Sequence, residues 1–110
     1  MVISTSRIIV RSDRRGDLIK TMKGILEPAR VERGCLSYRL YNDIENRNAF
    51  VLLEEWATQE DLERHIRTEN EQRLLALMDL LSVQPELRFN TVSETVGMEL
   101  IEDVLKTATP

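Results

Sequence analysis

The sequence has one cysteine and one histidine among its 110 residues. One cysteine cannot form a disulfide within the chain, and the two residues together cannot supply an ordinary zinc site. No apolar run approaches the roughly 20 residues of a membrane-spanning helix. The segment 1–7 also lacks the basic and apolar regions of a secretion signal. We therefore expect a cytoplasmic protein that does not insert into a membrane.

Signatures of nucleotide and nucleic-acid binding are also missing. The four glycines are scattered, without a G-x-G-x-x-G or Walker pattern, which disfavours a tightly bound flavin or NAD. The net charge is −4, and only the stretch around Arg14 and Arg15 is densely basic. The electrostatic attraction that drives nucleic-acid binding is therefore weak. We expect no nucleic-acid partner and no bound cofactor.

The composition is that of an ordinary globular chain, with 42% hydrophobic and 31% charged residues. Its length leaves room for one domain. A domain of this size buries only about two thirds of the surface that its unfolded chain exposes, so a subunit interface would add considerably to its stability. We predict one domain over 1–96 and an amphipathic tail over 97–110, which packs on its own domain or on a partner subunit.

The first third of the chain predicts a strand and a helix. The segment 3–11 is β-branched, and the polar pair Ser12-Asp13 suits the start of a helix. Apolar residues then recur at helical spacing from Leu18 to Ala29. Pro28 predicts a kink or an early break, because proline cannot donate the helical hydrogen bond. Gly34 predicts the end of this region in a left-handed conformation.

The rest of the chain predicts a hairpin, two short helices and a last strand. The segments 35–41 and 49–56 read as strands on either side of a turn-rich stretch, which indicates an antiparallel hairpin. Thr58 and Thr68 each stand where a helix start is expected, followed three residues later by an acid. A strand over 87–94 then precedes the tail.

The order β-α-β-β-α-β, with its second helical region split in two, predicts the ferredoxin-like arrangement of the α+β class. In this arrangement an antiparallel sheet carries its helices on one face. The strands are apolar in both phases, so neither face of the sheet is a clean solvent face. Packing of the second face against the sheet of another copy would explain that pattern. We therefore predict a homodimer that forms a dimeric α/β barrel.

Three spaced segments resemble the antibiotic biosynthesis monooxygenase family: GCLSYRLYND at 34–43, FVLLEEW at 50–56, and Asp61-Leu62 with His65. The most specific feature is Glu-Trp at the end of a strand with a histidine nine residues after the tryptophan. The resemblance extends over roughly 6–92 and implies a homodimeric barrel with a pocket between helices and sheet. Characterised relatives include cofactor-free monooxygenases that oxidise quinols or anthrones with O2, haem-degrading enzymes and a processing enzyme for a bacterial signalling molecule.

His65 and Trp56 are the catalytic candidates. The charge of a histidine changes near neutral pH, so His65 could deprotonate a phenol or orient a carbonyl. Its alternative role is that of a surface or supporting histidine. Trp56 could line a pocket wall and donate its indole N–H to a substrate oxygen, or it could only fill the core.

Four other residues are candidates for binding a substrate. Glu54 shares the strand phase of Trp56, and a buried carboxylate there would need a basic partner such as Arg7 or Arg39. The alternative for Glu54 is a solvated strand end or an ion pair across a dimer. A hydroxyl on either face of the second strand could reach a ligand or only complete a packing contact. The binding candidates are Tyr38, Tyr41, Glu54 and Arg7.

Three functions are compatible with these residues. The first is a cofactor-independent monooxygenase that oxidises a small phenolic or quinol-type substrate with O2, which makes a small aromatic or quinone-like molecule the expected partner. The second is a non-catalytic dimeric module that binds small molecules, and the third is an isomerase of a small carbonyl compound. Haem-degrading relatives carry a ligating histidine about ten residues beyond the position of His65, where this chain has the apolar stretch 74–77. That difference argues against haem.

Overall fold

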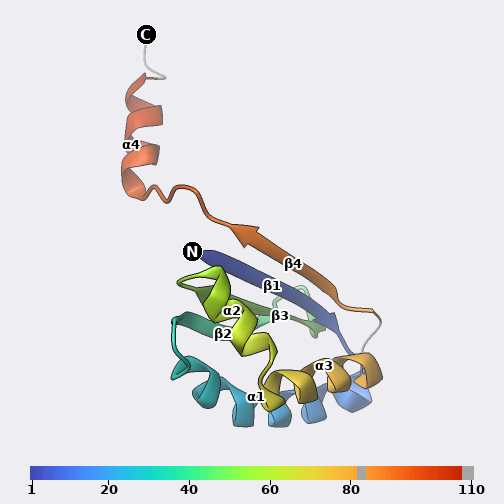
Figure 1. Cartoon of the computed structure of the whole chain (residues 1–110). Helices are drawn as coiled ribbons and strands as arrows, with labels where there is room; N and C mark the ends of the chain where they lie inside the picture. The colour runs from blue at the N-terminus through green and yellow to red at the C-terminus, as the bar shows by residue number, and fades with distance from the viewer. Residues whose placement is uncertain (82–83, 108–110) are drawn as a thin grey trace.

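A computed structural model describes residues 1–81 and 84–107. Figure 1 shows a single antiparallel sheet with helices on one side of it. The strands are β1 (Val2–Ile9), β2 (Cys35–Asp43), β3 (Asn46–Trp56) and β4 (Glu86–Thr91). The helices are the 3-10 turn η1 (Ser12–Arg14), α1 (Arg15–Arg30), α2 (Gln59–Ile66), α3 (Glu69–Leu81) and α4 (Met98–Thr107).

The four strands lie in the order β2-β3-β1-β4, and each neighbouring pair is antiparallel. Helices α1, α2 and α3 cover one face of the sheet, whereas α4 stands apart from the body (Figure 1). This arrangement is the predicted ferredoxin-like α+β fold. No helix in the described residues is long and apolar enough to cross a membrane.

The core lies between the sheet and the layer formed by α1, α2 and α3. Alternate residues of β1 and β3 point into it because successive strand side chains face opposite sides. From α1, the predicted face packs against them through Leu18, Met22, Ile25 and Ala29, all buried. Full burial of a large apolar side chain contributes about 1.5–3 kcal/mol, so this layer contact is the main source of stability.

Two predictions for the first helix are wrong. Neither Ser12 nor Asp13 caps α1, because these residues form the 3-10 turn η1 and no side chain caps either helix start. The helix also continues through Pro28 to Arg30, so the early break is wrong, whereas a kink at Pro28 stays a prediction. Pro28 lies in the last turn, where it removes only one hydrogen bond, and the buried side chain of Ala29 keeps that turn against the sheet.

The predicted turn at Gly34 and the helix starts predicted at Thr58 and Thr68 are confirmed. Gly34 has a φ of +80°, in the left-handed region that favours glycine. Thr58 Oγ1 accepts a hydrogen bond from the backbone N–H of Asp61 at 3.1 Å. Thr68 Oγ1 accepts one from the N–H of Glu71 at 3.2 Å. Each threonine therefore fixes where a helix begins.

The β2–β3 hairpin is confirmed, but its turn is tighter than predicted. The strands continue to Asp43 and resume at Asn46. Asn42, a turn former by type, donates its side-chain amide to the carbonyl of Ala49 at 2.8 Å. Side-chain hydrogen bonds of this kind let polar residues stay within the strand ladder.

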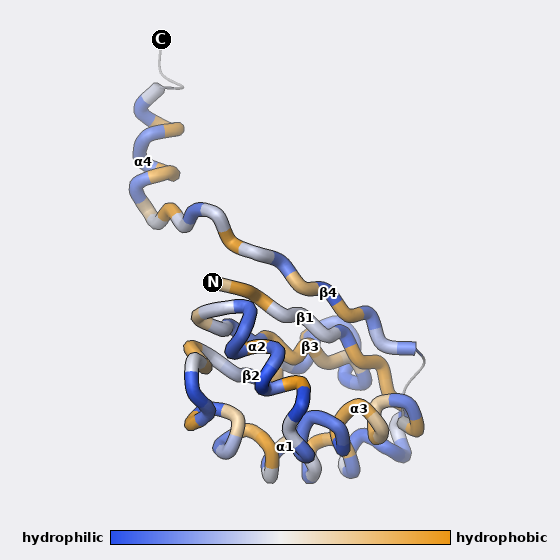
Figure 2. Tube along the Cα trace, viewed as in Figure 1, coloured by the Kyte–Doolittle hydropathy of each residue, from blue (hydrophilic) through white to orange (hydrophobic). Residues whose placement is uncertain are grey.

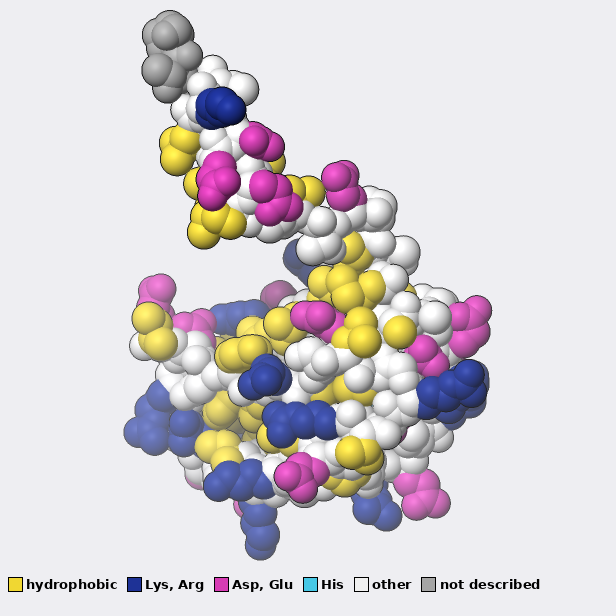
Figure 3. Space-filling model, turned by 90° about the vertical axis from the view of Figure 1, so that its left-hand side faces the viewer, with side chains coloured by type: hydrophobic (Ala, Val, Ile, Leu, Met, Phe, Trp, Pro, Cys, Tyr) yellow, Lys and Arg dark blue, Asp and Glu magenta, His cyan; other side chains and the backbone are white. Residues whose placement is uncertain are grey.

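The amphipathic tail forms α4, in which no side chain is buried. Met98, Ile101 and Val104 are more than half exposed. Figure 2 shows hydrophobic and hydrophilic residues alternating along this helix, and Figure 3 shows hydrophobic side chains on it and on the nearby surface of the sheet. The structure does not bury α4 against its own domain, so packing on a partner subunit stays a prediction.

Candidate functional site

His65 lies at the centre of a buried cluster of carboxylates, here called the His65 cluster. Its side chain is 1% exposed. Nδ1 lies 3.0 Å from both carboxylate oxygens of Glu32, and Nε2 lies 3.0 Å from Oε2 of Glu71. Oε1 of Glu54 lies 3.4 Å from Nε2. Both ring nitrogens therefore face negative charge, which favours the imidazolium form.

Two aromatic rings complete the His65 cluster. Trp56 stacks on the imidazole with ring centroids 4.5 Å apart and an interplanar angle of 29°. Tyr38 meets the same ring edge-on at 5.5 Å and 68°. Both are fully buried. A charged imidazole against an indole face gains a cation–π attraction, which adds to the stabilisation from the carboxylates.

Glu54 enters the cluster from β3 and is 3% exposed. Oε1 accepts a hydrogen bond from Trp56 Nε1 at 3.0 Å, and Oε2 accepts one from Ser4 Oγ at 3.4 Å. The prediction that Arg7 or Arg39 is the basic partner of Glu54 is wrong, because His65 is the cation beside this carboxylate. Arg39 stands opposite Leu53, and Arg7 opposite Val51, so both have the strand phase opposite to that of Glu54.

The surroundings move two pKa values upward. Burial raises the pKa of Glu54 to about 7, and the charge of Glu71 adds to this, while His65, Trp56 and Ser4 oppose it. Burial alone would lower the pKa of His65, but the hydrogen bond and charge of Glu71, with Glu32 and Glu54, outweigh it and raise the pKa to about 9. At neutral pH, His65 is therefore charged and Glu54 is poised to exchange a proton.

The hydroxyl of Tyr38 is buried and has no hydrogen-bond partner among the described residues. Burial, with the charges of Glu54 and Glu71, holds its pKa far above the usual range, so the phenol stays neutral. An unpaired buried hydroxyl costs about 1–3 kcal/mol. A ligand oxygen that reached Tyr38 would recover that cost.

A backbone turn and two helix starts position the cluster. Gly34 lies in the turn after Glu32, and a Cβ at this position would overlap the side chain of Asp61. The carbonyl of Gly34 accepts a hydrogen bond from the N–H of Ala57 at 2.8 Å, just before α2. This contact holds the Glu32 turn against α2, so that Glu32 reaches His65.

Sequence reasoning did not identify Glu32 and Glu71 as members of the site. The sequence places Glu71 three residues after Thr68 and Glu32 two residues before Gly34, but no local pattern places either beside His65. A signal did exist, because a buried histidine needs a partner for each ring nitrogen. Acids that stand just before a left-handed glycine or in the first turn of a helix are candidates for that role.

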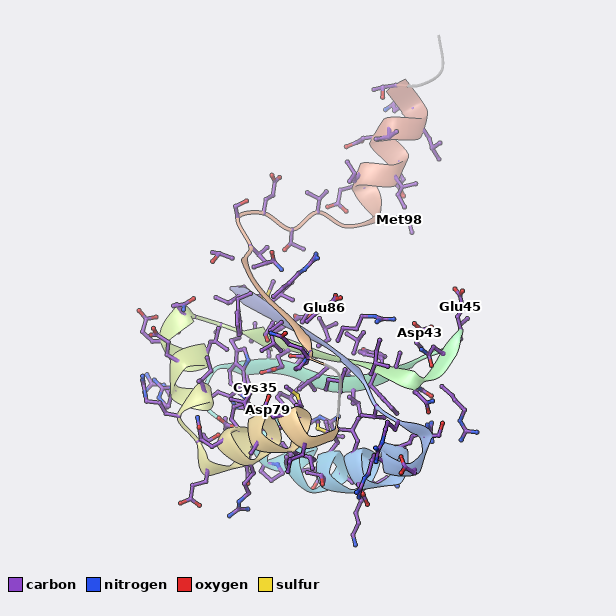
Figure 4. The ribbon with its side chains drawn as sticks, turned by 90° about the vertical axis from the view of Figure 1, so that its right-hand side faces the viewer. Cys35, Asp43, Glu45, Asp79, Glu86 and Met98 are labelled. Carbon is purple, nitrogen blue, oxygen red and sulfur yellow. The ribbon has the colours of Figure 1, made fainter. Side chains whose placement is uncertain are left out.

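Tyr41 and Arg7 lie away from the His65 cluster. Both stand opposite Val51 on β3, so the three residues form one row on the sheet face without helices. Tyr41 is 49% exposed. Arg7 pairs with Asp43 at 3.7 Å, next to the hairpin turn that Figure 4 shows at one end of the sheet. The structure thus brings together His65, Trp56, Glu54 and Tyr38, but not these two candidates.

The cluster has the composition of a metal site but not its geometry. Among the described residues, no group of three or more histidine, cysteine or acidic side chains could hold a metal ion. The carboxylates point at the ring nitrogens of a charged histidine, which leaves no lone pair for a metal.

A groove of about 1160 Å³ lies at the other end of the helix layer. The end of β1, the first half of α1 and the second half of α3 enclose it. No member of the His65 cluster is among its described lining residues. The helix layer therefore has a closed polar end and an open end.

A sequence model of the family described as "Antibiotic biosynthesis monooxygenase" matches residues 1–76. An uncharacterised protein of Synechocystis is 28% identical over 95 residues, which cover 86% of this chain. This chain covers only 65% of that relative's length. A Bacillus subtilis protein named "Putative monooxygenase YcnE" is 25% identical, with 86% of this chain and all of that protein covered.

Solved structures share the fold at low sequence identity. A Deinococcus radiodurans protein named as a "putative antibiotic biosynthesis monooxygenase" superimposes with a TM-score of 0.83 at 19% identity, covering 88% of this chain and 97% of that one. Rv0793 of Mycobacterium tuberculosis gives 0.80 at 23% identity, with 87% and 98% covered. These similarities establish the fold of the chain.

Proposed function

This chain belongs to the antibiotic biosynthesis monooxygenase family, and we propose that it oxidises a small phenolic or quinol-type substrate with O2 and without a bound cofactor. The observation that carries this proposal is the unpaired buried hydroxyl of Tyr38. It belongs to a residue that contacts the ring of His65 and stands opposite Glu54 on the neighbouring strand. A phenolic oxygen bound to Tyr38 would meet a proton acceptor beside it.

The proposed chemistry begins with loss of a substrate proton. Glu54 has a pKa of about 7, so its carboxylate can accept that proton near neutral pH. The resulting electron-rich carbanion gives electrons to O2 directly. For an anthrone-type CH2 group, one oxygen atom becomes the product carbonyl and the other leaves as water. All four electrons come from the substrate, so no reductant is needed.

In this proposal His65 acts through its charge. It lies 3.4 Å from Glu54, and its ring nitrogens already face Glu71 and Glu32. Its positive charge stabilises the negative charge that develops as the substrate ionises. Trp56 forms the wall next to His65 and holds the Glu54 carboxylate through its indole N–H.

Oxygen uptake with a panel of quinols and anthrones tests the proposal. Tyr38→Phe removes only an unpaired hydroxyl, so it should leave the melting temperature unchanged or higher while kcat/KM falls more than tenfold. Tyr41→Phe, on the opposite sheet face, is the matched control and should retain activity. Glu54→Gln should reduce kcat by roughly 10²–10⁴-fold, the usual value of a general base. No uptake by folded wild-type protein with any panel member would contradict the proposal.

A second candidate is a non-catalytic module that binds small molecules. It is supported by the lack of a free nitrogen on His65, because carboxylates face both ring nitrogens. A ligand that raises the melting temperature without turnover would favour it. An isomerase of a small carbonyl compound would use the same groups to move protons without O2. Turnover under anaerobic conditions separates the isomerase from the monooxygenase.

We also propose that the helix-free sheet face packs against the same face of a second copy, forming the barrel. Ile3, Val51 and Leu53 lie on this face with intermediate exposure, and Tyr41 extends it. In such a dimer, Tyr41 and Arg7 would face the partner. Leu53→Arg should produce a monomer in sedimentation experiments, whereas Arg73→Ala, which removes an exposed side chain of α3, should not. A wild type that sediments as a monomer would contradict the dimer.

A further inference from the structure

The groove at the open end of the helix layer has an apolar interior. Leu80 is 83% exposed and Ile9 is 36% exposed, although both border this concave site of about 1160 Å³. Pockets for small molecules usually measure about 300–1,000 Å³ and are lined mainly by apolar groups. The described apolar lining residues of the groove include Ile9, Val10, Leu77 and Leu80.

Gly24 helps to keep the groove open. It lies inside α1, where glycine is less favourable than alanine. A Cβ at this position would meet nothing within 4 Å, so packing does not require glycine there. Any larger side chain at Gly24 would occupy the space of the groove.

The groove carries positive charge in a chain of net charge −4. Its described lining contains three cationic side chains and one acidic side chain, a net charge of +2. Arg11 pairs with Asp13 at 3.2 Å, and Arg14 pairs with Asp17 at 3.3 Å. Exposed ion pairs are weak, so either guanidinium can turn to a ligand at little cost.

We propose that this groove binds a small apolar carboxylate. The apolar part of the ligand lies against Leu77, Leu80 and Val10, and its carboxylate meets the guanidinium of Arg14 and the ammonium of Lys20. Charge complementarity selects the anion, because a neutral chain would gain only the apolar contact. The site is distinct from the His65 cluster: on α3, Leu80 stands nine residues after Glu71, a distance of roughly 13 Å along the helix.

Titration of decanoate into the full chain, followed by calorimetry, tests the proposal. Decanol and decyltrimethylammonium serve as the neutral and cationic ligands of equal chain length. We expect decanoate to bind at least tenfold more tightly than decanol, and the cation to bind most weakly. Equal affinity for all three would overturn the charge-selective site.

Two sets of variants locate the site. Gly24→Leu should abolish decanoate binding because it fills the groove. Gly16→Leu is the matched control, since Gly16 also lies in α1 with nothing within 4 Å of a Cβ but does not line the groove. The double variant Arg14→Glu and Lys20→Glu should weaken decanoate binding at least tenfold and leave decanol unchanged. Decanoate affinity that persists in Gly24→Leu, or in a folded double variant, would overturn the proposal.

Discussion

The two ends of the helix layer contain very different side chains. At the His65 cluster, an imidazole, three carboxylates and two aromatic rings lie together between helices and sheet. At the groove, α1 and α3 leave apolar side chains open to solvent beneath a basic rim. The closed end can tune protonation because water is excluded there. The open end can admit a molecule, but the charged side chains there interact only weakly because they are exposed to water.

The largest expected effect is at the closed end. His65→Ala leaves the carboxylates of Glu32, Glu54 and Glu71 around an empty space without their cation. Removal of one partner from a buried ion pair costs about 3–5 kcal/mol. Urea denaturation should therefore show a loss of this size. Arg64→Ala removes an exposed cation from the same helix and should cost less than about 1 kcal/mol. Equal losses of stability in the two variants would show that the buried charge of His65 stabilises the fold no more than an exposed cation does.

The second effect is a fall in stability as pH rises. Glu54 has its pKa raised from 4.5 to about 7, so folding favours its protonated form and this contribution is lost as pH rises from 4.5 through 7. His65, raised from 6.5 to about 9, stabilises the fold fully below 6.5 and loses that contribution as pH rises through 9. Each loss is on the order of 3 kcal/mol.

Denaturation curves from pH 4.5 to 9.5 measure this dependence. Glu54→Gln cannot titrate, so its stability should be flatter between pH 4.5 and 7 and should still fall above 6.5. Lys20→Gln at the groove should leave the profile of the wild type unchanged. If the free energy of unfolding rises with pH through this range, the His65 cluster does not dominate the pH dependence of stability.

The third effect contrasts two glycines. Gly34→Ala should lower the free energy of unfolding by about 1–3 kcal/mol. The left-handed φ strains alanine, and the Cβ of alanine would overlap Asp61. Gly24→Ala at the groove should instead stabilise the protein by about 0.5–1 kcal/mol. Thermal melting of the two variants gives both signs. Two losses of similar size would mean that the groove end is as tightly packed as the cluster end.

The smallest effect concerns the helix starts. Thr58→Ala should cost about 1 kcal/mol, because it removes the cap of α2 that positions His65. Asp13→Ala, before α1, should cost less than about 0.5 kcal/mol, because Asp13 makes only an exposed pair with Arg11. The same denaturation assay measures both. A larger loss of stability for Asp13→Ala would indicate that Asp13 caps the helix, as the sequence predicts.

The sequence predicts those parts of the fold that depend on local patterns. Helical spacing from Leu18 to Ala29, strand alternation and the threonine starts each reflect contacts within a few residues. Gly34 was identified for the same reason, because a left-handed turn is a local property. At Pro28, packing of Ala29 on the sheet outweighed local preference. At Ser12, the hydroxyl accepts a hydrogen bond from the side chain of Asn48 instead of capping the helix.

The site was only partly predictable. Trp56, Glu54 and His65 could be grouped by strand phase and by family resemblance, whereas the partner of Glu54 depends on how α2 lies over β3. Glu32 reaches His65 only through the turn at Gly34, and no sequence spacing gives that distance. The family resemblance implies a pocket between helices and sheet, but the place of the groove could not be predicted, because it depends on the separation of α1 and α3.

The central position of β1 has a consequence for how the chain folds. Val2, at the start of β1, pairs with Trp56 of β3 and with Thr91 of β4. The β2–β3 hairpin is local and can form early, whereas β1 must close two long loops to enter the sheet. Because β4 follows the other three strands in the sequence, β1 gains its second neighbour only after all four strands have been synthesised.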